Sequence, residues 1–261
     1  MKTIAILSSV GGAGRTTLTA ALAGLLMARK HAVLAVECDP SNVLALYCGL
    51  REPAREGLAS YVPTLTGRAA EAALQSEDGV LWLPWGGAGL DGGGAIATSL
   101  HERPSWLREL LARVDLPSHS IVLVDAAIWP SVYAAQAIEA ADLVMVVVPP
   151  QPLACATLPR LRAELIAREK PSLYVANAVS PALQLHTDIL ALLRDTLGSE
   201  LSAYRIHADT GIPEALARNQ NFHLSTPHSQ AAHDMQGLAS WLSSWVRHAP
   251  RASAMPTGGA T

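Results

Sequence analysis

The sequence predicts one doubly wound α/β domain over residues 1–249, with a mainly parallel sheet flanked by helices. Short apolar runs alternate with stretches of helical periodicity along the whole length, without an internal repeat, and this alternation is typical of a parallel sheet. The chain has 261 residues, of which 50% are hydrophobic, enough to bury one large core. The final stretch, 250–261, is small, polar and rich in Gly and Pro, so we expect a disordered tail.

The first predicted strand and helix enclose a glycine-rich turn. Residues 2–8 form an apolar run typical of a buried strand, and 18–28 has the pattern of a helix. Glycines let the backbone turn tightly and bring its N–H groups to an anion, and the helix adds its own free N–H groups. The turn is therefore predicted to bind phosphate through Gly11, Gly12, Ala13, Gly14, Arg15, Thr16 and Thr17. The alternative is a glycine-rich turn without a ligand.

The turn departs from the standard phosphate-loop pattern, G-x-x-x-x-G-K-[ST], at two positions. Ser9 stands where the pattern has its first glycine, and Arg15 stands where it has its lysine. Arginine keeps the positive charge but presents a planar fork in place of a compact ammonium group. Thr16 keeps the hydroxyl that can ligate Mg²⁺. We therefore expect phosphate binding to be retained and hydrolysis to be slow or absent.

Two further predicted strands end in carboxylates. The apolar run 32–40 ends near Asp39, and the run 120–125 ends in Asp125. Ligands of open α/β sheets bind at the carboxyl ends of strands, so Asp39 should face the phosphate loop. Asp125 is then placed to hold Mg²⁺ directly or through water. The alternatives are that Asp39 caps a helix starting near Asn42 and that Asp125 merely begins a turn.

The remaining elements follow from periodicity and from Gly and Pro punctuation. The segment 50–78 is predicted as a short helical region, 79–84 as a strand, 85–94 as a surface loop and 99–114 as a helix. Beyond Asp125 we expect strands over 141–148, 172–177 and 203–207, helices over 153–168 and 225–248, and a short helix after 211–215. The last long helix is expected to pack on the domain, with a membrane-surface helix as the alternative.

Composition narrows the classes of function. The net charge is −3 and the pI about 6.3, which argues against a broad basic surface for nucleic acid. The cysteines lack metal-ligand spacing and are expected as small buried hydrophobes in a reducing compartment: Cys38, Cys48 and Cys155. No signal peptide or run of about 20 apolar residues is present, so we expect a cytoplasmic protein. Three histidines spaced five apart are not expected to bind metal: His223, His228 and His233.

The loop resembles the deviant K-G-G-x-G-K-[ST] motif of the ParA/MinD family of P-loop ATPases. Val10 and Arg15 stand at its two lysine positions, and the other positions match at Gly11, Gly12, Gly14 and Thr16. The family carries D-x-D-P where this chain has 37–40. The resemblance implies ATP and Mg²⁺ as ligands, with Asp39 orienting the attacking water. It also implies that Asn177 reads the adenine base, although an Asn at a strand end is otherwise a common turn residue.

Within that group, the degenerate loop and two later segments, 212–215 and 231–233, resemble the BcsQ family of cellulose synthesis. The resemblance places Ile212 and Pro213 among the nucleotide-binding residues. It implies a homodimer that assists a membrane cellulose synthase, with small partners such as BcsR and possible recruitment to the inner membrane face. The rival interpretations are a DNA-partitioning or pole-positioning ATPase, against which Val10 and the acidic balance count, and a P-loop kinase. No DNA binding is expected.

Overall fold

The computed structural model describes residues 1–47, 49–62, 73–76, 78–87 and 89–248. The predicted tail at 250–261, residues 63–72 and 77 of the predicted helical region 50–78, and Cys48 lie outside the described residues. The described part of 50–78 holds one 3₁₀ turn, Leu58–Tyr61, and a short strand, Leu74–Gln75, so the helical prediction is wrong for that part. Among the described helices, none combines the length and the apolar character needed to cross a membrane.

Within the described chain, seven strands form one sheet in the order β3-β4-β2-β5-β1-β6-β7. Neighbouring strands run parallel, except that β3 and β4 are antiparallel. The predicted fold class, a mainly parallel sheet flanked by helices, is confirmed. The strands are β1 (Lys2–Leu7), β2 (Val33–Cys38), β3 (Leu74–Gln75), β4 (Leu81–Leu83), β5 (Ile121–Ala126), β6 (Leu143–Val148) and β7 (Ser172–Ala176).

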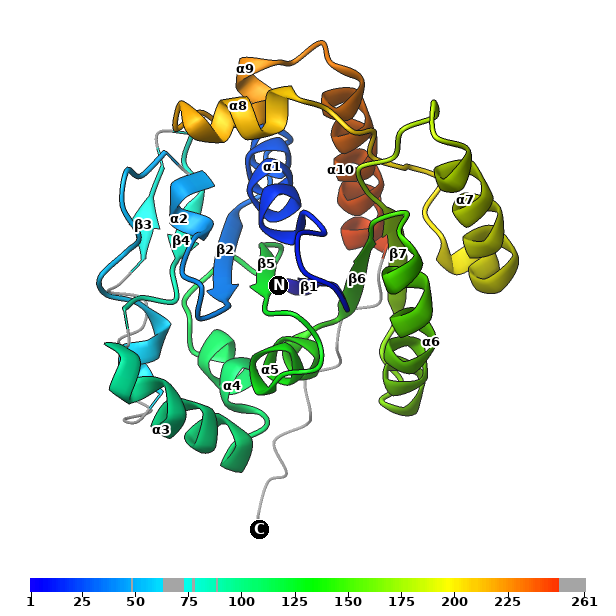
Figure 1. The fold of residues 1–261 in the computed structure, drawn as a ribbon. Helices are drawn as coiled ribbons and strands as arrows, with labels where there is room; N and C mark the ends of the chain where they lie inside the picture. Colours follow the sequence, from blue (N-terminus) through cyan, green and yellow to red (C-terminus); the bar gives the residue numbers. More distant parts are fainter. Residues whose placement is uncertain (48, 63–72, 77, 88, 249–261) are drawn as a thin grey trace.

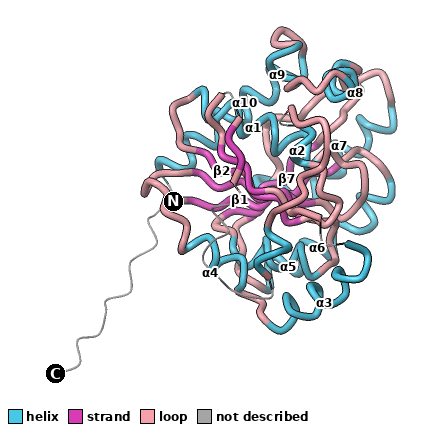
Figure 2. The backbone as a smooth tube through the Cα atoms, turned by 90° about the vertical axis from the view of Figure 1, so that its left-hand side faces the viewer, coloured by secondary structure: helices cyan, strands magenta, loops and turns pink. Residues whose placement is uncertain are grey.

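Helices cover both faces of the sheet (Figures 1 and 2). On one face lie α1 (Arg15–Ala28) and α10 (Gln230–His248), and on the other lie α4 (Trp106–Ala112), α5 (Val132–Ala140) and α6 (Pro152–Ala167). Every residue of β2, β5 and β6 is buried as a result. Strands buried on both sides carry continuous apolar runs, which is why they are recognisable in the sequence.

The helix α1 is buried along most of its length because α10 packs on its outer side. Its residues are mainly Ala and Leu, and they give no pronounced polar face. The buried apolar residues of α10 recur at helical spacing: Ala231, Ala232, Met235, Leu238, Ala239 and Leu242. The expectation that the final helix packs on the domain is confirmed, although it begins at Gln230 and not at Ser225. A separate short helix, α9 (Phe222–Ser225), precedes it.

Two predictions for the region 85–114 are wrong. The expected surface loop at 85–94 is helical from Gly89, where α3 (Gly89–Glu102) begins. The expected helix at 99–114 is broken, because Pro104 disfavours helical geometry at the residue before it and separates α3 from α4. Buried Gln136 of α5 supplies hydrogen bonds to the backbone at this break, because its amide donates to the carbonyls of Leu100 and Arg103.

Three other elements differ from expectation. The strand predicted at 203–207 is replaced by isolated bridges, Tyr174 to Leu201 and Val179 to His207, because the chain touches β7 and the segment that follows it at separate points. The short edge strand β3 and the helix α7 (Gln184–Leu197) were not predicted. The remaining short helices are α2 (Leu44–Tyr47), a 3₁₀ turn at Leu58–Tyr61, a 3₁₀ turn at Gly198–Glu200 and α8 (Gly211–Ala217).

Candidate functional site

The glycine-rich turn joins the carboxyl end of β1 to the start of α1, as the sequence predicts. Gly12 and Gly14 have φ of 67° and 90°, a left-handed backbone that L side chains rarely adopt. Within the described part of the protein, the backbone N–H groups of Gly11, Gly12 and Gly14 have no acceptor. Together with the free N–H groups in the first turn of α1, which holds Thr16 and Thr17, they form a cradle suited to an anion.

Asn177 holds this loop in place. It follows β7, its side chain is buried, and its Nδ2 donates to the carbonyl of Ala13 at 2.6 Å. A Cβ added to Gly14 would overlap the same Nδ2, so the two residues are packed as a unit. The structure therefore brings Asn177 to the phosphate loop, and its expected role at an adenine base stays a prediction.

Asp125 is a buried carboxylate without a partner. It is 1% exposed, and neither of its oxygens has a partner in good hydrogen-bond geometry among the described residues, although the Thr16 hydroxyl lies close to it. Burial raises the pKa of this carboxyl group to about 7, although the nearby Thr16 hydroxyl and Arg15 charge oppose the shift. An ionised carboxylate is costly to bury alone, and carboxylate and hydroxyl oxygens are the ligands that Mg²⁺ prefers. Asp125 and Thr16 thus fit a magnesium ion.

Asp39 lies beside the loop and is paired with Arg15. Oδ2 of Asp39 is 3.4 Å from Nη1 of Arg15, which also donates to the carbonyl of Ala126. Oδ1 of Asp39 accepts from the N–H of Ser41 at 2.9 Å. Arg15 therefore links the ends of β2 and β5. The predicted position of Asp39 facing the loop is observed, and its role toward a water molecule stays a prediction.

Glu37 makes the helix cap that the sequence suggested as an alternative role for Asp39. Its Oε1 accepts from the N–H groups of Val43 and Leu44 at 2.6 and 2.9 Å, where α2 begins. Its Oε2 accepts from the N–H of Trp85 at 3.2 Å, after β4. Glu37 is fully buried and opposes Asp125 across the β2–β5 pair. An acidic residue inside a buried apolar strand was the signal that could have revealed this role.

The buried carboxyl of Glu37 should make stability depend on pH. Burial raises its pKa from an ordinary 4.5 to about 7, against the effect of its three N–H donors. Between these values the folded protein holds a proton that the unfolded chain has lost, so the free energy of unfolding should fall as pH rises. We expect a loss of up to about 3 kcal/mol.

Urea denaturation of the ligand-free protein at about pH 5 and about pH 8 measures this loss. In Glu37→Gln, which cannot titrate, the fall over the same interval should be smaller. An identical fall in the two proteins would show that Glu37 is not its source.

The structure connects the other residues singled out in the sequence less directly with the phosphate loop. Val10 is buried at 6% exposure, so its apolar side chain lies in the core. Ile212 and Pro213 form part of the first turn of α8, half-buried and exposed respectively. No hydrogen bond or ion pair among the described residues joins them to the loop. Cys38 is buried as expected, whereas Cys155 is half-buried, so that expectation was wrong for Cys155.

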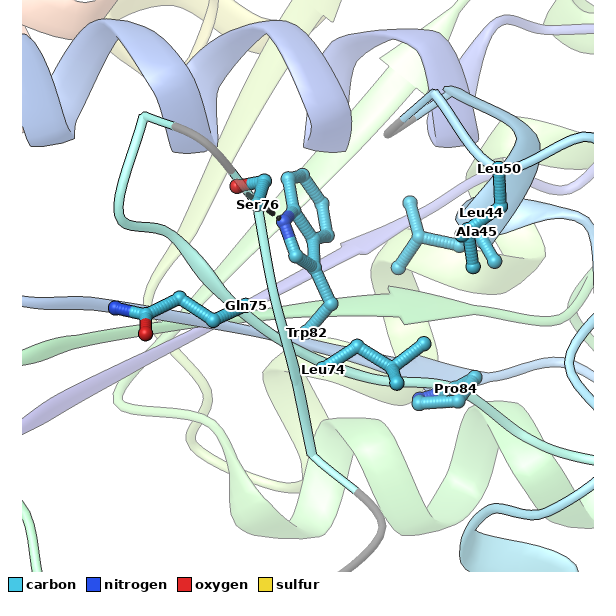
Figure 3. Close-up of a pocket in the computed structure, with 8 residues that line it drawn as sticks. All are labelled: Leu44, Ala45, Leu50, Leu74, Gln75, Ser76, Trp82 and Pro84. Carbon is cyan, nitrogen blue, oxygen red and sulfur yellow. Dashed lines mark hydrogen bonds between the residues drawn. The ribbon is translucent and has the colours of Figure 1, made fainter.

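An apolar cavity lies away from this site, between α2 and the β3–β4 pair (Figure 3). Its volume is about 50 Å³, whereas small-molecule sites typically occupy about 300–1,000 Å³. The Trp82 ring in its wall is held by a hydrogen bond from its Nε1 to Ser76. The cavity is therefore too small for a nucleotide. It is lined by Leu44, Ala45, Leu50, Leu74, Gln75, Ser76, Trp82 and Pro84.

Comparison with solved structures identifies the fold. A cobyrinic acid a,c-diamide synthase from Mycobacterium smegmatis with bound ADP and magnesium superposes with a TM-score of 0.76 and 17% identity, over 96% of this chain and 97% of that one. The septum site-determining protein MinD from Pyrococcus horikoshii OT3, complexed with Mg-ADP, gives 0.75, 19%, 92% and 95%. An ATP complex of a McdA variant from Cyanothece gives 0.75, 19%, 93% and 96%. The fold is that of the MinD-like P-loop ATPases.

Comparison with protein families gives one match over nearly the whole chain. The family described as cellulose biosynthesis protein BcsQ matches residues 1–242. This span includes the phosphate loop and both carboxylate-bearing strands, and it extends through most of α10. No curated protein sequence matches the chain.

Proposed function

Because the chain belongs to the cellulose biosynthesis protein BcsQ family, we propose that it is an ATP-binding accessory protein for bacterial cellulose synthesis and secretion. It is a ParA/MinD-type protein by family and fold. The observation that carries its nucleotide dependence is the unpartnered buried carboxylate of Asp125 beside Thr16, below a loop whose N–H groups are free.

In this proposal the loop from Gly11 to Thr17 binds the phosphates of ATP. Its N–H groups and the positive end of α1 attract the anion, and Asn177 keeps the loop in the binding conformation. Thr16 and Asp125 hold Mg²⁺, which supplies positive charge against the phosphates. Asp39 is the candidate for orienting a water molecule. Ile212 and Pro213 are proposed to contact the nucleotide base.

Hydrolysis is proposed to be weak or absent. Relatives carry a lysine where this chain has Val10, and the buried Val10 side chain supplies no charge to a partner's phosphates. Arg15 keeps a charge in its own site, but as a planar fork in place of a compact ammonium group, and in the ligand-free protein it is held by Asp39 and by the Ala126 carbonyl. The transition state is then less well stabilised, and each 1.36 kcal/mol lost slows turnover about tenfold. ATP is proposed to act chiefly as a structural ligand that holds two copies of the chain together as a dimer.

The proposed partners are a second copy of the chain, a small protein such as BcsR, and the membrane cellulose synthase. The family description supports the link to cellulose. A protein of the same fold occurs in a MinC:MinD cell division complex from Aquifex aeolicus. This complex supports the proposal that this chain also binds protein partners. We propose a cytoplasmic protein that can be recruited to the inner membrane face. DNA is not a proposed ligand, given the net charge of −3.

Replacing Thr16 by Ala should weaken Mg²⁺-dependent ATP binding about tenfold or more, because it removes an oxygen ligand beside Asp125. The measurement is calorimetric titration with ATP, with and without Mg²⁺. Thr19→Ala is the matched control, since the Thr19 hydroxyl donates to the Arg15 carbonyl inside α1 and is fully buried. Equal affinity of wild type and Thr16→Ala in the presence of Mg²⁺ would remove Thr16 from the proposed site.

ATP with Mg²⁺ should convert the protein to a dimer while phosphate release stays far below the ordinary scale of about 10 per second. Light scattering and multiple-turnover phosphate release measure the two quantities on the same sample. Rapid turnover, or a chain that stays monomeric with ATP and Mg²⁺, contradicts this part of the proposal.

The cellulose role is tested in the native host. Deletion of the gene should abolish or reduce cellulose secretion, and wild type but not Thr16→Ala should restore it. Unchanged secretion after deletion would overturn the assignment to cellulose without affecting nucleotide binding.

A further inference from the structure

Arg15 starts α1 directly after the phosphate loop, yet its side chain reaches the ends of two strands. Nη1 lies 3.4 Å from Oδ2 of Asp39 after β2 and donates to the carbonyl of Ala126 at the end of β5. The side chains of Arg15 and Asp39 are 11% and 15% exposed. Charges shielded from water attract each other more strongly than surface pairs do, so this ion pair is costly to open.

Both oxygens of Asp39 already have a partner in the ligand-free protein. One of its oxygens contacts Arg15 and the other accepts the Ser41 N–H. Asp125, by contrast, keeps both oxygens free of hydrogen bonds from described residues. The carboxylate proposed to orient water is therefore occupied in the ligand-free protein, whereas the carboxylate proposed to hold the metal is available.

Arg15 is also the positively charged residue nearest to the phosphate loop along the chain. It is the first residue of α1, and phosphates bind at such helix starts. A guanidinium binds phosphate best through two parallel N–H donors. Nη1 is already shared between Asp39 and Ala126, so a two-pronged contact with phosphate that includes Nη1 requires the side chain to leave them.

We propose that the Arg15–Asp39 ion pair is a latch which bound nucleotide opens by drawing Nη1 of Arg15 into contact with its phosphates. The phosphates and Asp39 compete for one guanidinium, so part of the binding energy is spent on separating the pair. Asp39 becomes free to contact water only when Arg15 has moved to the phosphates. This inference rests on the proposed function, because it requires phosphates at the loop.

Competition predicts that removing the Asp39 charge tightens nucleotide binding, but only while Arg15 is present. Asp39→Asn keeps an oxygen for the Ser41 N–H and loses the attraction for Arg15. With a non-hydrolysable ATP analogue and Mg²⁺, Asp39→Asn should bind about tenfold more tightly than wild type. In an Arg15→Gln background, the same substitution should leave the affinity unchanged. The four proteins form a double-mutant cycle measured by calorimetry.

The controls separate the latch from a general effect of charge. Asp195→Asn removes an exposed carboxylate on α7 and should not change affinity. If Asp39→Asn is not folded by circular dichroism, Asp39→Ser replaces it in the cycle. An equal gain with and without Arg15, or no gain in either background, overturns the latch while nucleotide binding stands. Failure of the wild type and every variant to bind the analogue overturns both the latch and the proposed function.

Discussion

Asp125→Asn should make the ligand-free protein more stable and nearly abolish its Mg²⁺-dependent nucleotide binding. The wild-type carboxylate is 1% exposed and without a hydrogen-bond donor among the described residues. Removing an uncompensated buried charge should raise the free energy of unfolding by about 1–3 kcal/mol at about pH 8. The same change removes the charged oxygen ligand for Mg²⁺ and should weaken Mg-ATP binding about 100-fold.

These opposite effects separate a binding residue from a structural one. Urea denaturation in the presence of a chelator measures stability, and calorimetric titration with Mg-ATP measures affinity. Asp195→Asn, in an exposed position on α7, should change neither quantity. A loss of stability in Asp125→Asn, or wild-type affinity for Mg-ATP, would show that the buried carboxylate serves the fold and not a metal.

Gly14→Ala should damage the phosphate loop more than alanine at Gly11 or Gly12, where an added Cβ would meet no atom closer than 3.5 Å. Gly14 has φ of 90°, which costs an L residue about 1–2 kcal/mol. The added Cβ would also overlap Nδ2 of Asn177, whose hydrogen bond to Ala13 holds the loop. We expect a destabilisation of about 3 kcal/mol or more and loss of measurable ATP binding.

Two companion variants identify the cause. Gly94→Ala lies inside α3 with open space around its Cβ, and should stabilise by about 0.5–1 kcal/mol. Asn177→Ala combined with Gly14→Ala removes the clash but not the strained φ, so it should recover part of the stability. Thermal melts and ATP titrations compare the set. A Gly14→Ala protein as stable as wild type would show that the loop adapts without cost.

Much of the fold was predictable because its strands are buried on both faces. The runs around β1, β2, β5, β6 and β7 are continuous and apolar, and each prediction matched a strand within a few residues. Strand topology then brought Asp39 and Asp125 to one edge of the sheet, next to the loop. The features that failed are local. The glycines from Gly92 to Gly94 indicated a loop, but their positions are helical in α3, a helix that buries Ile96 and Leu100 further along.

The connections within the site were not predictable from residue spacing. The sequence shows a charge at Arg15, but only the fold decides that it contacts Asp39 at the end of β2. Asn177 lies 164 positions from Ala13 and meets it because β7 and β1 are separated by a single strand, β6. In the sequence, Glu37 is one position of the 37–40 motif. In the structure its carboxylate accepts hydrogen bonds from three N–H groups and so joins α2 to the end of β4. Long-range hydrogen bonds leave no periodic trace in a sequence.

The most direct test of the central claim is calorimetric titration of the purified wild-type protein with ATP, first with Mg²⁺ and then with a chelator. A magnesium site formed by Asp125 and Thr16 beneath a phosphate-binding loop predicts saturable binding of one nucleotide per chain, at least about tenfold tighter with Mg²⁺. Binding that is absent, or that has the same affinity with and without Mg²⁺, would contradict the assignment of this edge of the sheet as a Mg-ATP site.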